Sequence, residues 1–184
     1  MIARDEALTL VRERIGNRNL VNHCVAAEII MEQLARHFEL PHADVERWAL
    51  AGLLHDLDYA STAEHFERHG LDTVEALGGA IDAEMAHAIL SHADKAPRET
   101  LMDRAMYAAD PTTGFIVAAA LVRPDKSLAA VEVRSLLKRW KEKAFARGAS
   151  REQMAACEDL GLSREAFLSL ALAAMQARAA EIGL

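Results

Sequence analysis

The apolar residues of this 184-residue chain recur at helical spacing, and this pattern restricts its fold more than any other feature. No segment shows the sustained polar and apolar alternation, rich in β-branched residues, that a half-buried strand requires. Helix-favouring residues (Ala, Leu, Glu and Arg) dominate, and 52% of the residues are hydrophobic. We therefore predict an all-α fold, in a chain long enough for one core but short for two.

Breaking and capping residues divide the chain into helical segments. We predict helices at about 4–15, 20–38, 43–55, 98–109, 128–147 and 163–182, and a further helix that begins at about 82 and ends before a turn at 94–97. Residues 60–79 are expected to form a loop with short helical turns. Gly52 is expected to let a neighbouring helix approach closely. Pro111 is expected to begin a new segment, and Ser150 and Ser163 are candidate helix caps.

Four potential metal ligands close or interrupt the apolar stripes: His23, His55, Asp56 and Asp110. His23 belongs to a stripe that also contains Leu20, Ala27, Ile30 and Leu34. His55 and Asp56 are adjacent, and adjacent residues in a regular helix point about 100 degrees apart. Both can reach one ion only near a helix end, which is where the pattern places them. Polar groups at buried positions need a partner, and a divalent cation would satisfy all four.

Each ligand type also has a simpler explanation when it is taken alone. A single inward histidine such as His23 is often a hydrogen-bonded core residue. Asp110 directly precedes Pro111, so it could cap a following helix. Taken together, however, the imidazoles and carboxylates suit a divalent ion such as Mn, Fe, Co, Ni or Zn. Such an ion activates water and polarises a phosphoryl oxygen, which favours phosphoester hydrolysis.

The order of these residues resembles a known signature. The chain resembles the HD superfamily of metal-dependent phosphohydrolases, and within it the small bacterial HDIG-type members. The resemblance is carried by the pattern H…HD…D, by the segment AGLLHDLDY at 51–59 and by the segment YAADPTTG at 107–114. The resemblance spans about residues 20–122. It implies a helical bundle as the core of one domain over residues 1–184, and we interpret 123–184 as a helical packing extension of that domain.

The resemblance also implies roles for individual residues. His23, His55, Asp56 and Asp110 would bind the first metal ion, while His69 and His92 stand where some relatives hold a second one, with Asp56 then bridging both. Beside the motif, Asp58 is a candidate for orienting water or acting in acid–base catalysis. Lys95 is a candidate catalytic residue, and Arg98 a candidate substrate contact, because either could meet a phosphate. Leu57-Asp58-Tyr59 replaces the Ile-Gly of the HDIG motif and lacks the lysine that follows it in some phosphodiesterases, which argues against cyclic dinucleotide cleavage.

The leading hypothesis is a metal-dependent phosphohydrolase that acts on a phosphomonoester or phosphodiester, nucleotide-like, through a metal-activated water. One alternative is a non-catalytic HD-like module that binds a nucleotide or a partner protein, and another is iron-dependent redox chemistry.

Charge and composition narrow the range of partners. The net charge of −7 provides no basic stripe for bulk nucleic acid, so a small phosphorylated substrate is the expected partner. Residues 1–14 have no apolar leader region and no apolar run is long enough for a membrane span, so we expect a cytoplasmic protein without membrane contact. Cys24 and Cys157 form no metal-binding or redox motif and are expected to be reduced.

Overall fold

The computed structural model describes all 184 residues and contains helices but no strand, so the prediction of an all-α fold is confirmed. The α-helices are α1 (Arg4–Ile15), α2 (Arg18–His37), α3 (His42–Leu54), α4 (Tyr59–Thr62), α5 (Leu71–Leu77), α6 (Ala83–His92), α7 (Leu101–Leu121), α8 (Val133–Trp140), α9 (Arg151–Ala155) and α10 (Arg164–Ala177). Four short 3-10 turns complete the chain: η1 (Phe66–Arg68), η2 (Gly78–Ala80), η3 (Ala156–Leu160) and η4 (Ala179–Ile182).

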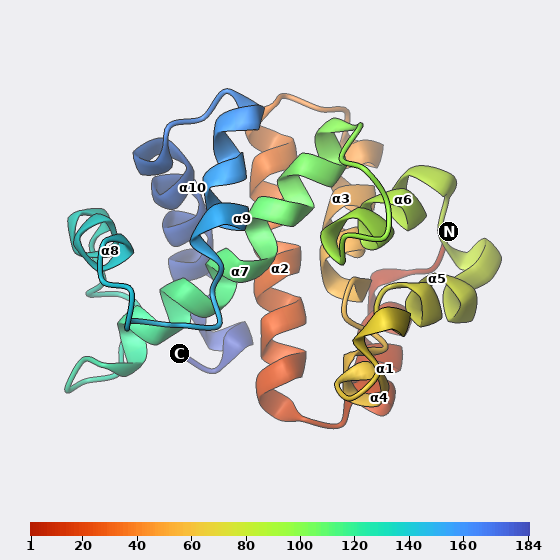
Figure 1. Ribbon diagram of the computed structural model, residues 1–184, viewed down its shortest axis with the longest axis horizontal. Coiled ribbons are helices and arrows are strands. Elements are labelled where there is room, and N and C mark those ends of the chain that lie inside the picture. Colours follow the sequence, from red (N-terminus) through yellow and green to blue (C-terminus); the bar gives the residue numbers. More distant parts are fainter.

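Helix α2 lies at the centre and packs against α3, α7 and α10 (Figure 1). On one side lie α3 and α6, and on the other lie the carboxyl-terminal helices α8, α9 and α10 (Figure 1). One cluster of buried hydrophobic residues extends from Ala7 in α1 to Ile182 in η4. The carboxyl-terminal helices therefore share a core with the helices that carry the predicted ligands.

Helices α2 and α3 approach each other closely at Gly52, as the sequence predicts. A Cβ atom at Gly52 would lie 2.7 Å from the carbonyl oxygen of Ala27 in α2. Only a residue without a side chain permits this backbone contact. The contact brings the carboxyl end of α3, where His55 follows, beside the part of α2 that carries His23.

The prediction that a new segment begins at Pro111 is wrong, because α7 runs through this proline from Leu101 to Leu121. Asp110 therefore lies inside a helix, and the alternative explanation of this residue as a helix cap is also wrong. Helix α7 begins later than expected, after a capping box formed by Thr100 and Asp103. Its buried face spans almost the whole helix, so tertiary packing outweighs the one backbone hydrogen bond that a proline removes.

The long helix predicted for 128–147 is also wrong, since α8 ends at Trp140. The Arg151 guanidinium supplies the physical reason, because it donates to the carbonyl oxygens of Trp140, Phe145 and Ala149. These bonds satisfy carbonyls that would otherwise accept from a continuing helix. The caps predicted at Ser150 and Ser163 are present, each accepting a backbone N–H of the following helix.

None of the helices combines the length and the apolar character that crossing a bilayer requires. Cys24 and Cys157 are both free and buried, as the prediction of reduced thiols requires.

Candidate metal centre

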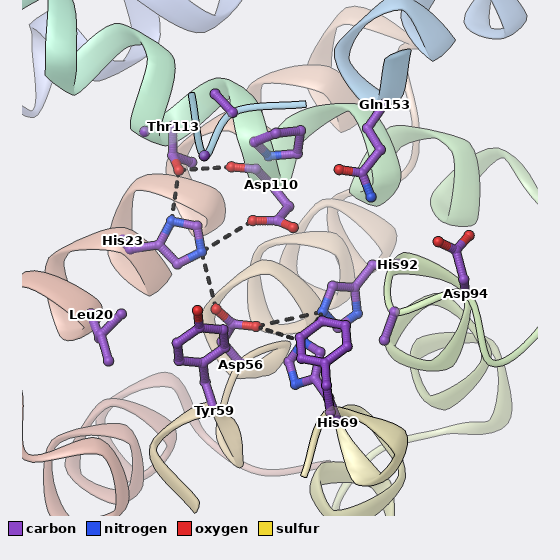
Figure 2. A pocket seen from close by; sticks show the side chains of 16 residues that line it. Leu20, His23, Asp56, Tyr59, His69, His92, Asp94, Asp110, Thr113 and Gln153 are labelled. Carbon is purple, nitrogen blue, oxygen red and sulfur yellow. Dashed lines mark hydrogen bonds and ion pairs between the residues drawn. The ribbon is translucent and has the colours of Figure 1, made fainter. Parts of the chain in front are cut away.

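The six predicted ligands come from separate elements and lie together. His23 is on α2, His55 and Asp56 follow α3, His69 follows η1, His92 ends α6, and Asp110 is on α7. Figure 2 shows the side chains of His23, Asp56, His69, His92 and Asp110 pointing toward one another. His55 is fully buried. The structure thus brings together residues that are up to 87 positions apart in the sequence.

One group of ligand atoms surrounds His23. Its Nε2 atom lies 3.2 Å from Nε2 of His55, from Oδ2 of Asp56 and from Oδ1 of Asp110. Nε2 of His55 lies 3.7 Å from Oδ1 of Asp110. Atoms that bind one divalent cation at about 2.0–2.2 Å lie about 3 Å from each other. The distances from His23 and His55 to their neighbours are therefore in the range that the ligands of one metal ion show, and His23, His55 and Asp56 form one group that could hold an ion.

A second group shares the Asp56 carboxylate. Nε2 of His69 lies 3.2 Å from Nε2 of His92. Oδ1 of Asp56 lies 3.4 Å from Nε2 of His69 and 3.5 Å from Nε2 of His92. Because Asp56 turns Oδ2 toward His23 and Oδ1 toward this pair, its position suits a carboxylate that bridges two ions.

All four histidines use Nδ1 to bond with a protein acceptor. The partners are Thr113 Oγ1 for His23, the carbonyl oxygen of Gly52 for His55, Asp58 Oδ1 for His69 and the carbonyl oxygen of Ile89 for His92. When Nδ1 of a neutral imidazole carries the proton, Nε2 carries a lone pair that can bind a metal ion. Four such lone pairs and two carboxylates facing one space repel each other unless a cation or protons lie between them. The donor set therefore fits a divalent metal ion.

Thr113 shows how the rest of the chain fixes these ligands. Its hydroxyl donates to the carbonyl oxygen of Asp110 at 2.7 Å, so its oxygen accepts from Nδ1 of His23, also at 2.7 Å. One residue thus orients one ligand and is tied to the backbone of another. The sequence reasoning missed Thr113, although its position three residues after Asp110 on a helix is a usable signal.

The electrostatics of the site reflect the same crowding. Burial alone would lower the pKa of His23, but the hydrogen bonds that its protonated imidazole donates to the Asp110 and Asp56 carboxylates, together with their negative charges, raise the pKa to about 10. Burial would raise the pKa values of Asp56 and Asp110, yet the facing imidazoles hold both well below the usual carboxyl range. A proton on His23 therefore occupies the place that a cation would take, and the two compete for Nε2.

The surroundings of Asp58 do not support its predicted role in orienting water or in acid–base catalysis. Its Oδ1 accepts from Nδ1 of His69 at 2.8 Å, and its Oδ2 accepts from the backbone N–H groups of Gly70 and Thr73. Burial would raise the pKa of Asp58, but the bond to His69 and these amides lower it. Asp58 is buried and does not line the cavity above the ligands. The geometry makes it a positioning residue for His69.

Lys95 and Arg98 also lie outside the cavity, so the structure gives no support to their predicted catalytic and substrate contacts. The Arg98 guanidinium donates to Asp94 at 2.8 Å and lies 3.9 Å from the centre of the Tyr107 ring. The positive charge of Arg98 is therefore paired with Asp94 at the edge of the cavity and does not point into the cavity.

A cavity of about 350 Å³ opens above the ligands. The carboxyl-terminal segment, which we interpret from the sequence as a packing extension, also contributes Gly148, Ala149 and Gln153 to the cavity wall. Tyr59 and Phe66 contribute aromatic rings, and Phe66 is 54% exposed. No local pattern in the sequence marks Gln153 as a cavity residue, since its position depends on how the last helices fold back over α7.

The sequence matches the family model described as HD domain over residues 20–120, which is more than half of the chain. The protein therefore belongs to the HD domain family, a superfamily of metal-dependent phosphohydrolases. Comparisons with curated proteins and with solved structures give no match. The part of the cavity wall formed by residues 148–153 lies outside the matched region.

Proposed function

We propose that this protein is a metal-dependent phosphohydrolase that cleaves a small phosphomonoester or phosphodiester, nucleotide-like, with His23, His55, Asp56 and Asp110 holding one divalent ion. His69 and His92 would hold a second ion with Asp56. One observation carries the proposal: histidine lone pairs and two carboxylates converge on the floor of an open cavity that is large enough for a small substrate.

The chain's own residues prepare this site for hydrolysis. A bound divalent metal would lower the pKa of water and stabilise charge on the phosphoryl oxygens. Thr113 and Asp58 keep the imidazoles of His23 and His69 in fixed orientations, so few ligand groups need to reorganise. In the reaction the water oxygen adds to phosphorus, the ester P–O bond breaks, and the leaving oxygen takes up a proton.

A non-catalytic nucleotide-binding or partner-binding module is the second candidate. One observation favours it: no lysine or arginine lines the cavity, whereas phosphoryl transfer sites commonly use such residues to stabilise charge. A metal ion held by the six residues would then bind the ligand without turning it over.

The deciding experiment combines elemental analysis with turnover. Protein purified without chelator should contain one to two equivalents of a first-row divalent metal. Loaded with Mn, Fe, Co, Ni or Zn, it should hydrolyse p-nitrophenyl phosphate, AMP or cyclic AMP. His55→Ala and Asp56→Ala should abolish both the bound metal and turnover. His42→Ala is the matched control, because His42 begins α3, the helix that His55 follows, and its side chain is 82% exposed.

Two results would contradict the proposal. If the metal-loaded protein binds these phosphates but turns over none of them, the non-catalytic candidate holds. If His55→Ala and Asp56→Ala retain wild-type metal content, the six residues are not the ligands.

A further inference from the structure

The cavity has an acidic and cation-free lining. It contains three carboxylates, Asp56, Asp94 and Asp110, and no lysine or arginine. Arg98 is near Asp94 but is occupied by that carboxylate and by the Tyr107 ring. Two of the carboxylates face the histidines, so metal ions would neutralise them, while Asp94 remains at the rim with its side chain 64% exposed. A bound phosphate can therefore find positive charge only at the metal centre.

The wall that faces this centre contains a free carboxamide. Gln153 belongs to α9, and Figure 2 shows its amide directed toward the space between Asp110, His92 and Asp94. Its backbone N–H bonds with Ser150 Oγ, but its side chain bonds with no protein group. A carboxamide offers two donors and one acceptor, so Gln153 presents unused hydrogen-bonding capacity to a ligand.

The position of Gln153 is fixed by the neighbouring Arg151. The Arg151 guanidinium donates to the carbonyl oxygens of Phe145 and Ala149, each at 2.8 Å, and lies 4.3 Å from the centre of the Phe115 ring in α7. These contacts tie the segment before α9 to the helix that carries Asp110. The carboxamide is therefore held on a supported wall, as selective recognition requires.

We propose that the site selects substrates with a single phosphoryl group, and that Gln153 recognises a polar, uncharged group on the organic part of the substrate. This inference rests on the proposed function for its reaction, but it concerns which phosphate is accepted. Each additional phosphoryl group brings negative charge into a region where the one nearby cation, Arg98, is already paired with Asp94, and no lysine or arginine of the lining is left to offset that charge. A neutral carboxamide, by contrast, can donate to and accept from a nucleobase or sugar.

The charge argument is tested with AMP and ATP at a constant concentration of free metal ion. We expect kcat/KM for AMP to exceed that for ATP by at least about tenfold. Gln153→Lys, which adds one positive charge to the wall, should raise the ATP to AMP ratio by about tenfold. Glu152→Gln is the matched control: it adds the same charge on the exposed side of α9 and should leave the ratio unchanged. Equal or better turnover of ATP by the wild type, or an unchanged ratio in Gln153→Lys, would overturn the proposal.

The recognition argument is tested with Gln153→Ala. Loss of neutral hydrogen bonds should raise KM for AMP about three- to tenfold and leave kcat nearly unchanged, because the contact is made equally in the ground and transition states. Phenyl phosphate has no polar group for Gln153 to meet, so its KM should not change. An equal rise for both substrates would overturn recognition of the organic part by Gln153.

Calorimetric titration of the metal-loaded protein with AMP and ATP separates this inference from the proposed function. If nothing is turned over, the proposed function fails, and the same charge preference is then read from the dissociation constants. Tighter binding of ATP than of AMP in that experiment would overturn the inference independently.

Discussion

Substitution of Gly52 by alanine should weaken the metal centre without touching a ligand. The added Cβ would lie 2.7 Å from the Ala27 carbonyl oxygen and 2.8 Å from the Glu28 nitrogen. Both are backbone atoms of α2, so no side-chain rotation can relieve the contact. To reach an ordinary contact distance of 3.4 Å, α3 must move away from α2 by about 0.7 Å.

The energetic cost follows from two opposing effects. Overpacking costs about 1–3 kcal/mol, and the upper end applies here because the contact is with backbone. Alanine is a better helix former than glycine by about 1 kcal/mol, which offsets part of this cost. We expect a net loss of about 2 kcal/mol, or a melting temperature lower by about 4–8 °C for a chain of this size.

The effect on metal binding should be larger than the effect on stability. The Gly52 carbonyl oxygen accepts from Nδ1 of His55 at 2.8 Å, so a shift of α3 moves this ligand. Metal–ligand distances tolerate about 0.2 Å, and disturbing the groups that hold a ligand weakens affinity about 10- to 100-fold. Calorimetric titration of metal-free protein should therefore show at least a tenfold weaker dissociation constant.

Gly114→Ala provides the opposite expectation for stability. Gly114 lies in α7 with nothing within 4 Å of its would-be Cβ, so alanine there should stabilise the protein by up to about 1 kcal/mol. If Gly52→Ala instead raises the melting temperature as Gly114→Ala does, and binds metal as tightly as the wild type, the close packing of α2 and α3 does not position His55.

Three further predictions concern the groups around the site. Asp58→Asn should weaken binding of the ion at His69 about 10- to 100-fold, because the imidazole of His69 loses its charged acceptor. A metal titration should show this as loss of the second equivalent, and unchanged stoichiometry and affinity would contradict it. The raised pKa of His23 contributes stability to the metal-free protein that is present below pH 6.5 and lost as pH rises through about 10. Metal loading near pH 7.5 should accordingly release a proton, and calorimetry in two buffers of different ionisation enthalpy should detect it; buffer-independent heats would refute it. Arg151→Ala leaves carbonyls before α9 without a donor and should lower the free energy of unfolding by about 1–3 kcal/mol in chemical denaturation, whereas a change below about 0.5 kcal/mol would show that these bonds are dispensable.

The positions in the fold that the sequence predicted in agreement with the structure depend on local periodicity. The stripe of α2 places His23 on an inward face because residues three and four apart share a side of a helix. His55 and Asp56 follow the last turn of α3, where two adjacent side chains can turn toward one point. Gly52 signals close helix approach because a glycine inside a helix is unfavourable unless it serves packing. These features follow from the chain within one or two helical turns.

The residues that the sequence did not predict depend on contacts between distant segments. Asp58 stands next to the motif, which favoured a catalytic interpretation, but its surroundings are set by Gly70 and Thr73. Pro111 has a strong local preference to end a helix, and only the packing of α7 against its neighbours overrides this preference. Gln153 reaches the cavity because Arg151 folds the preceding segment over α7. Neither periodicity nor spacing encodes such long-range contacts.

If the six residues bind metal as proposed, metal binding and folding are coupled, because these residues come from α2, the end of α3, the turn after η1, the end of α6 and α7. A cation shared among these elements cross-links segments that loops alone would leave to pack independently, and it stabilises the fold in proportion to the logarithm of its concentration over its dissociation constant. In its absence the same elements hold like partial charges against one another, with a proton on His23 as partial compensation. Helices α2 and α3 are in backbone contact. In the metal-free protein this packing is opposed by electrostatic repulsion between the six residues, whereas in the metal-loaded protein it is reinforced by metal coordination. For this reason a substitution at Gly52, one helical turn from the nearest ligand, tests the metal centre as directly as removal of a ligand does.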